Sequence, residues 1–378
     1  MAEDTRVRLL IADDQPDVLE ALRLLLAQEN FSMQLVTSPA ALVEQVHTAT
    51  WDAVLMDLNY SRDTTSGAEG LQLLKQIRTR QHDLPIVVMT AWGNIELAVE
   101  AMRAGAQSFV QKPWDNRALV QVLEREAAAG REARARSERH EREERDALLI
   151  QRALIPATLP ATARFAVAAA WHPAGNLGGD CYDAFTFAPD VIGLSIADIA
   201  GKGLPAALLM SSVQSALRAF ALDAAPPQAV CASINRLLCG QMIAGRFATL
   251  AYLRLDAGRG TIAYANAGHN PPLVARTNGE VEQLSATGTV LGVFPEAEYL
   301  GGEVALQSGD RLLLYTDGIT EARNQKEEEF GIERLTDILT RNRHRDAATL
   351  HELVMDDVTR FATAGFHDDA TLLAVAVR

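Results

Sequence analysis

Polar side chains stand directly after short apolar segments in the first third of the chain. The positions are Asp13 and Asp14 after Arg8–Ala12, Asp57 and Thr90 at the ends of their runs, and Lys112 after Ser108–Val110. Three carboxylates placed together repel one another and need a hard cation such as Mg²⁺, which takes oxygen ligands. Asp57 could then attack a phosphoryl group and form an aspartyl phosphate. Lys112 would add positive charge, and Thr90 a hydroxyl donor, toward the phosphoryl oxygens.

A second set of aspartates lies in four separate motifs beyond residue 170. They are Gly178-Gly-Asp-Cys-Tyr-Asp183, Ala197-Asp-Ile-Ala-Gly-Lys-Gly203, Tyr315-Thr-Asp-Gly318 and His367-Asp-Asp-Ala-Thr371. Glycine beside an aspartate at a strand end permits close backbone approach, so these carboxylates are expected at one sheet edge. A carboxylate-rich site without a His or Cys cluster suits Mg²⁺ or Mn²⁺ rather than zinc. Two such ions make water a nucleophile near neutral pH, which suits hydrolysis of a phosphate monoester.

The elements that must position the first set alternate regularly between strand and helix. Apolar runs at 8–12, 53–56, 86–89 and 108–110, with a weaker one at 33–36, are separated by helical patterns around 17–28, 40–48, 69–80, 95–104 and 115–128. Most runs are apolar on both faces, as in parallel strands covered by helices on both sides. This order predicts an α/β doubly wound sheet, whose ligands bind beyond the carboxyl ends of the strands.

A highly charged segment follows at residues 124–146, with eight acidic and seven basic residues. Its pairs Glu132–Arg136, Glu138–Arg142 and Glu141–Arg145 are spaced i,i+4 in the favourable order. We predict a solvated helical linker. A dimeric coiled coil, and with it a homodimer, is left open, although a seam of Ala, Arg and Glu gives a poor heptad signal.

The remainder of the chain has a different order of predicted strands and helices. Ala147–Leu159 reads as a first helix, strand-like runs follow at 165–171, 191–197, 249–255, 261–265, 311–315 and 371–377, and helical patterns at 204–221, 226–243 and 331–362. Paired strands with helices grouped apart indicate an α+β domain of two packed sheets flanked by helices. The predicted division is therefore 1–123, a linker at 124–146, and 147–378.

Composition narrows the functional classes. The net charge of −14 disfavours a nucleic-acid surface, which requires a concentrated basic patch. Three cysteines without a C-x-x-C pair argue against a disulfide framework, and a reducing cytoplasm fits best. The polar first residues carry no secretory signal, and no apolar run reaches the length of a membrane span. We expect a cytoplasmic protein without nucleic-acid or membrane partners.

Residues 6–125 resemble the receiver domain of two-component response regulators. The resemblance implies that Asp13 and Asp14 help to hold Mg²⁺, that Asp57 is the phosphoacceptor supplied by a sensor histidine kinase, and that Lys112 contacts the phosphoryl group. Thr90 and Phe109 resemble the family's switch pair, and Lys112-Pro113 its Lys-Pro step, often cis. The loop before Gly70 is longer than usual, and we expect it to affect which kinase docks.

Residues 147–378 resemble the metal-dependent protein phosphatase (PPM) superfamily, in the branch of the sporulation stage II and stress sigma-factor regulators. Further matching phrases are Ile150-Gln-Arg-Ala-Leu-Ile-Pro156, Phe247-Ala-Thr-Leu250, Ala265-Asn-Ala-Gly-His-Asn-Pro-Pro-Leu273 and Ser308-Gly-Asp-Arg311. The resemblance implies an αββα sandwich with two Mn²⁺ or Mg²⁺ ions. Its implied metal ligands are Asp180, Asp198 with the carbonyl of Ile199, Asp317 and Asp368. Asp369 is a weaker candidate ligand, and Asp183 would contact a ligand without binding the metal itself.

Together the two resemblances imply a response regulator whose Asp57 phosphorylation controls a phosphoserine or phosphothreonine protein phosphatase. Family analogy points to a phosphorylated anti-sigma-factor antagonist as the substrate. The alternative is a non-catalytic adaptor that binds a phosphoprotein or a sigma regulator. For His269 a structural role in a tight turn is favoured over catalysis, and for Cys181 a buried small side chain is favoured.

Overall fold

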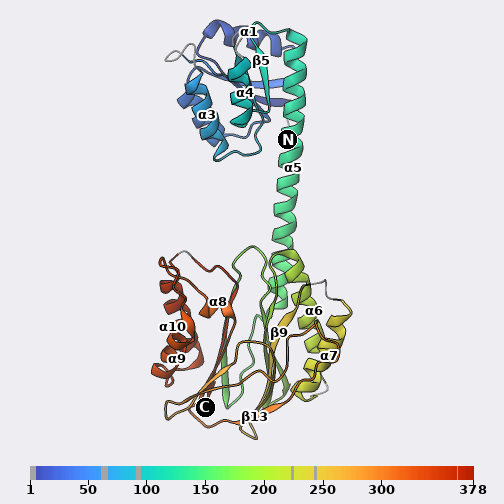
Figure 1. The fold of residues 1–378 in the computed structure, drawn as a ribbon, viewed down its shortest axis with the longest axis vertical. Coiled ribbons are helices and arrows are strands. Elements are labelled where there is room, and N and C mark those ends of the chain that lie inside the picture. Colours follow the sequence, from blue (N-terminus) through green and yellow to red (C-terminus); the bar gives the residue numbers. More distant parts are fainter. Residues whose placement is uncertain (1–5, 61–66, 91–94, 223–224, 242–244, 364) are drawn as a thin grey trace. The chain divides into compact units, whose positions relative to one another are not determined.

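The computed structural model describes residues 6–60, 67–90, 95–222, 225–241, 245–363 and 365–378. Within it the chain separates into two compact units, Met1–Glu141 and Arg142–Arg378, and the division lies inside one helix. Figure 1 shows the fold with its elements labelled in chain order.

The first unit is built on a five-stranded parallel sheet in the order β2-β1-β3-β4-β5. Apolar clusters fill both faces of this sheet, which is why its inner strands are apolar on both sides. The predicted doubly wound α/β fold is confirmed. Its elements are β1 (Val7–Ala12), α1 (Pro16–Leu26), β2 (Phe31–Val36), α2 (Pro39–Thr48), β3 (Ala53–Asp57), α3 (Ala68–Arg78), β4 (Ile86–Thr90), α4 (Ile95–Arg103) and β5 (Ser108–Gln111).

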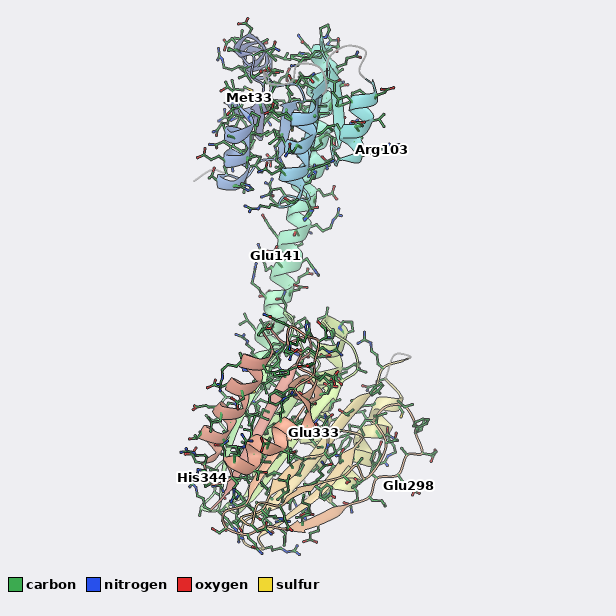
Figure 2. The ribbon with its side chains drawn as sticks, turned by 60° about the vertical axis from the view of Figure 1, so that its left-hand side comes forward. Met33, Arg103, Glu141, Glu298, Glu333 and His344 are labelled. Atoms are coloured by element: carbon green, nitrogen blue, oxygen red, sulfur yellow. The ribbon has the colours of Figure 1, made fainter. Side chains whose placement is uncertain are left out.

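A single helix, α5 (Asn116–Leu154), combines three predicted pieces: the last receiver helix, the charged linker and the first helix of the next domain. Residues 135–143 are all exposed, and Figure 2 shows the side chains around Glu141 projecting from the ribbon. The predicted solvated helix is therefore present, and the dimeric coiled coil stays an open alternative. Among the described residues no helix has the length and apolar character needed to span a bilayer.

The second unit contains two five-stranded sheets in the orders β13-β10-β9-β8-β7 and β12-β11-β14-β15-β6. Neighbouring strands in both sheets are antiparallel. The strands are β6 (Phe165–His172), β7 (Cys181–Ala188), β8 (Val191–Ile199), β9 (Ala248–Asp256), β10 (Thr261–Ala267), β11 (Leu273–Ala275), β12 (Val281–Gln283), β13 (Gly302–Ala305), β14 (Arg311–Tyr315) and β15 (Ala370–Val377).

Helices cover the outer faces of the two sheets. Figure 1 shows α6 and α7 on one side and α9 and α10 on the other, with the sheets between them. One apolar cluster lies between the sheets and one lies under each helical layer, so the αββα sandwich is confirmed. The helices are α6 (Leu204–Ala221), α7 (Pro227–Cys239), α8 (Asp317–Thr320), α9 (Gly331–Arg341) and α10 (Ala347–Phe361).

Several local features differ from the sequence expectation, which contained no strand at β11, β12 or β13 and no helix at α8. Cys181–Ala188 forms β7, an edge strand that was not predicted. The helical pattern at 331–362 is two helices rather than one, labelled in Figure 2 at Glu333 on α9 and at His344 between α9 and α10. The second helix begins at Ala347 and is capped by Asp346, whose side chain accepts the N–H of Thr349 at 2.8 Å.

Candidate metal centres and active site

The first cluster lies at the carboxyl ends of β1, β3 and β5. Asp13, Asp14 and Asp57 each offer a carboxylate oxygen, and these oxygens lie within 4.8 Å of one another. Lys112 Nζ lies 2.7 Å from Asp13 Oδ2 and 3.1 Å from Asp57 Oδ2. The structure therefore brings together the three predicted carboxylates and the predicted lysine, from residues nearly 100 positions apart in sequence.

This cluster has the electrostatics of a cation site. Burial raises the pKa of Asp57, the Lys112 ammonium offsets part of that rise, and the Asp13 carboxylate adds to it. Asp14 Oδ1 is buried without a hydrogen-bond partner in the described structure. An unpartnered buried oxygen beside two further carboxylates fits a hard divalent ion with oxygen ligands, such as Mg²⁺.

The predicted switch residues lie on adjacent strands. Thr90 ends β4 and is 2% exposed, and its carbonyl accepts the backbone N–H of Lys112 at 2.8 Å. Phe109 on β5 is 46% exposed. The Lys112–Pro113 peptide bond is cis. Most of the long loop expected to affect kinase docking, residues 61–66, lies outside the described residues.

The second cluster forms where strands from both sheets of the sandwich meet. Its predicted ligands are Asp180 just before β7, Asp198 in β8, Asp317 at the start of α8, and Asp368 just before β15. Two threonines connect the sheets at this point. The hydroxyls of Thr316 and Thr371 donate to Asp180 Oδ2 at 2.6 and 2.7 Å. The N–H of Thr371 in turn donates to Thr316 Oγ1 at 2.9 Å.

The carboxylates of this second cluster perturb one another strongly. Burial, followed by the charges of Asp317 and Asp368, raises the pKa of Asp198 to about 7. Burial and then Asp198 raise the pKa of Asp180 well above its ordinary value, although the two threonine hydroxyls oppose this. Burial and Asp368 also raise the pKa of Asp317. Divalent cations stabilise crowded, ionised carboxylates, so this donor set fits Mg²⁺ or Mn²⁺.

The two weaker candidates have other partners. Asp183 Oδ2 lies 2.5 Å from Arg218 Nε, and Oδ1 accepts the Arg218 NH2 group at 2.9 Å. Asp369 accepts the backbone N–H groups of Ala174 at 2.8 Å and Gly179 at 2.5 Å. These contacts favour a charge pair with α6 for Asp183, and anchoring of the 174–180 loop for Asp369.

A cavity of about 280 Å³ opens beside Asp368, with Lys202, Arg323 and His367 in its lining. Lys202 Nζ lies 3.1 Å from Asp368 Oδ2 and donates to the His367 carbonyl at 2.7 Å. A flexible ammonium group next to a carboxylate cluster is well suited to contact an incoming phosphate.

His269 is not a titrating group at neutral pH. It is 4% exposed, and burial lowers its pKa to about 4. Its ring Nδ1 lies 2.7 Å from Thr249 Oγ1, and its backbone N–H donates to Asn266 Oδ1 at 2.8 Å. Thr249 in β9 pairs with Asp198 in β8, so His269 contacts the strand next to the one that carries Asp198.

Thr316 and Thr371 lie inside two of the aspartate motifs, but the sequence predicted no role for them. Their partner, Asp180, is 136 residues from Thr316 and 191 residues from Thr371, so no local sequence pattern predicts the contact. The only available signal was a hydroxyl residue beside each aspartate motif.

The geometry agrees with what family comparison finds. Residues 188–378, more than half of the chain, match the model described as "Stage II sporulation protein E (SpoIIE)". The chain belongs to the stage II sporulation protein E family. Residues 9–124 match the model described as "Response regulator receiver domain".

Individual relatives cover parts of the chain. It is 28% identical over 229 residues to phosphoserine phosphatase RsbU of Bacillus subtilis, spanning 60% of this chain and 67% of that protein. It is 28% identical over 253 residues to protein IcfG of Synechocystis sp., spanning 60% of this chain but only 40% of that protein. The SiaA-PP2C domain of Pseudomonas aeruginosa superposes with a TM-score of 0.57 at 23% identity, covering 65% of this chain and 99% of that one. This last likeness supports the sandwich fold.

Proposed function

We propose that this chain is a metal-dependent phosphatase of phosphoserine or phosphothreonine in another protein, controlled by phosphorylation of Asp57. The observation that carries the proposal is the convergence of Asp180, Asp198, Asp317 and Asp368 at one place where the two sheets meet. The relative RsbU bears the name of a phosphoserine phosphatase, which supports the same chemistry.

Each residue of the second cluster has a separable task. Asp198, with the Ile199 carbonyl, Asp180, Asp317 and Asp368 would hold two Mn²⁺ or Mg²⁺ ions, which when bound supply charge and a water nucleophile. Thr316 and Thr371 orient Asp180 through its Oδ2 atom. Lys202, whose side chain is 62% exposed beside Asp368, would contact the phosphate of a substrate.

The receiver unit would supply the control. Asp57 would accept a phosphoryl group from a sensor histidine kinase, with Mg²⁺ held by Asp13, Asp14 and Asp57. Lys112 lies 3.1 Å from Asp57, close enough to contact that phosphoryl group. For the substrate we propose a phosphorylated anti-sigma-factor antagonist, in line with the family to which the chain belongs.

The test is phosphate release from a phosphoserine protein in Mn²⁺, with and without a small-molecule phosphodonor. We expect Asp198→Asn to lower turnover at least a hundredfold, because it removes a carboxylate that would help to hold the two metal ions. We expect Asp57→Asn to abolish the response to the donor. Turnover that persists in Asp198→Asn would refute the catalytic assignment, and no turnover in the wild type would favour the adaptor.

A further inference from the structure

A half-exposed phenylalanine lies on the same face of its sheet as the Asp198 carboxylate. Asp198 in β8 is in register with Thr249 in β9. The backbone N–H of Ala200 donates to the Phe247 carbonyl at 2.9 Å, which continues this pairing past the start of β9. Residues two apart in a strand point to the same face, so Phe247 faces the same side as Thr249 and Asp198. The Phe247 side chain is 37% exposed.

Small neighbours leave the Phe247 ring open to a partner. On one side its strand partner is Ala200, which carries only a methyl group. On the other side the antiparallel bridge between Ala248 and Leu291 places Gly292 beside Phe247, and glycine has no side chain. An aromatic ring between two such small residues forms a shallow platform at the end of the strand that follows the metal centre.

The segment after Gly292 adds two exposed apolar side chains. Val293 is 43% exposed and Phe294 is 57% exposed. The buried side chain of Asn235 on α7 fixes this segment, because it accepts the Gly292 N–H at 2.8 Å and donates to the Phe294 carbonyl at 2.9 Å. Holding the segment in place in advance lowers the entropy cost of binding a partner there. We call Phe247, Val293 and Phe294 the apolar rim.

The spacing between the apolar rim and the metal centre matches that of an extended peptide. Phe247 is two residues from Thr249, the strand partner of Asp198, and two residues of strand span about 7 Å. In an extended peptide, the side chain two residues from a phosphoserine points to the same side and lies about 7 Å along the chain. A phosphoserine at the Asp198 carboxylate would therefore bring that neighbouring side chain to the Phe247 ring.

We propose that the apolar rim docks the segment of the substrate protein that carries the phosphoserine, with an apolar side chain two residues away against Phe247. This rests on the proposed function, since it takes the phosphoserine to the second cluster. The metal ions and Lys202 would hold the phosphate, which all phosphoserine proteins share. The rim therefore supplies the discrimination between such proteins. Grouped exposed apolar side chains that include aromatic rings are well suited to contribute binding energy.

The probes are short labelled peptides in which the phosphoserine is replaced by its phosphonate analogue, which resists hydrolysis. One peptide has Leu two residues before the analogue, a second has Leu two residues after it, and a third has Ser at both places. Fluorescence anisotropy measures their affinity for the full chain in Mn²⁺. We expect the wild type to bind one of the Leu peptides at least tenfold more tightly than the Ser peptide.

The variants are Phe247→Ser and, as a matched control, Leu222→Ser. Leu222 is 76% exposed and directly follows α6, whose 18 residues place it about 27 Å from the start of that helix near Lys202. Phe247→Ser should lower the affinity for the favoured Leu peptide at least tenfold, and leave that for the Ser peptide within threefold. Leu222→Ser should change both less than twofold. Should circular dichroism show Phe247→Ser unfolded, Phe294→Ser should lower the affinity for the Leu peptide at least threefold.

Equal affinity of the wild type for the three peptides, or no binding of any, overturns the proposal. So does a folded Phe247→Ser variant that keeps the preference for Leu. A variant that loses a dimer seen by analytical ultracentrifugation, with peptide affinity unchanged, also overturns it and assigns the rim to a second copy of the chain.

Because the probes are not hydrolysed, failure of this inference is distinguishable from failure of the proposed function. A wild type that prefers a Leu peptide but releases no phosphate from phosphoserine proteins refutes the enzyme and leaves the docking surface in place. A wild type that hydrolyses phosphoserine but binds the three peptides equally refutes only the docking surface.

Discussion

At the scale of single residues, the second cluster is distinguished by the raised pKa values of its aspartates. Asp198 and Asp180 are held where burial and neighbouring carboxylates oppose their ionisation. In the metal-free protein both carboxyls therefore keep their proton to a higher pH than an ordinary aspartate does. The raised pKa values are therefore evidence of a cation site that complements the grouping of the ligands.

The raised pKa of Asp198, about 7, predicts a pH dependence with a definite sign. In the unfolded chain the carboxyl ionises near pH 4, so between about pH 4 and 7 the native metal-free state holds an extra proton. Its stability should fall as pH rises through that window. Mn²⁺ needs the ionised carboxylate, so affinity should rise about fivefold from pH 6 to pH 7 and about twofold more by pH 8, where it levels off.

Calorimetry in two buffers of different ionisation enthalpy measures this directly. We expect close to one proton released per Asp198 site at pH 6, with fewer at pH 8. An Mn²⁺ affinity that is the same at pH 6 and pH 8, without proton release, would contradict the assignment of Asp198.

At the scale of elements, the cluster depends on α8 beginning immediately beside the start of β15. A Cβ atom at Gly318 would lie 2.0 Å from the Asp369 carbonyl oxygen and 3.1 Å from that of Asp368. The backbone can approach this closely only because the residue after Asp317 is glycine. Two ligand motifs that are distant in sequence are thereby brought together.

Gly318→Ala should separate these two motifs. We expect a loss of about 1–3 kcal/mol in the free energy of unfolding from overpacking, and at least a tenfold loss of phosphatase turnover. Gly175→Ala is the control, because a Cβ there meets nothing within 4 Å. It should stay within about 0.5 kcal/mol of the wild type. Thermal denaturation and phosphate release measure both, and equal effects of the two variants would show that the close approach is unimportant.

Sequence patterns predicted the elements where periodicity is strong and the contacts are local. The apolar strands β3, β8 and β14, which lead to Asp57, Asp198 and Asp317, were recognisable because burial on both faces leaves a continuous apolar run. Thr316 and Thr371 were not assigned roles, because each bonds to a side chain far along the chain. The helix α5 was predicted as three adjoining helical pieces at 115–128, 124–146 and 147–159, because its exposed middle has no apolar stripe to connect its two buried ends.

At the scale of the whole molecule, α5 is the only described helix with residues in both compact units. In the first unit it is anchored to Asp52, a residue 5% exposed. Arg131 Nε lies 3.0 Å from Asp52 Oδ2, and Arg134 pairs with Oδ1. Gly130 approaches Pro85 and the Asp52 carbonyl so closely that a Cβ would clash with both, so α5 is held tightly at this point.

This anchor predicts a variant that separates signal from activity. Asp52→Asn should lower the free energy of unfolding of the first unit by about 1–2 kcal/mol, because the two arginines lose their charged partner. The loss stays this small because their partly exposed guanidinium groups regain water. It should also reduce the effect of a phosphodonor on phosphate release at least threefold. The control is Arg136→Ala, which removes an exposed i,i+4 pair with Glu132 and should leave that effect intact. An unchanged donor response in Asp52→Asn would show that the anchor carries no signal.

The pairing of β6 with β15 has a consequence for biosynthesis. Phe165 in the first strand of the second unit is in register with Val377 in β15, and all eight residues of β15 are buried. On the ribosome, β6 therefore emerges long before the strand that covers it has been translated, and such non-local pairing forms late. The same late strand follows Asp368. A nascent chain consequently lacks part of the proposed metal centre, and the proposed phosphatase activity can begin only after translation has passed β15.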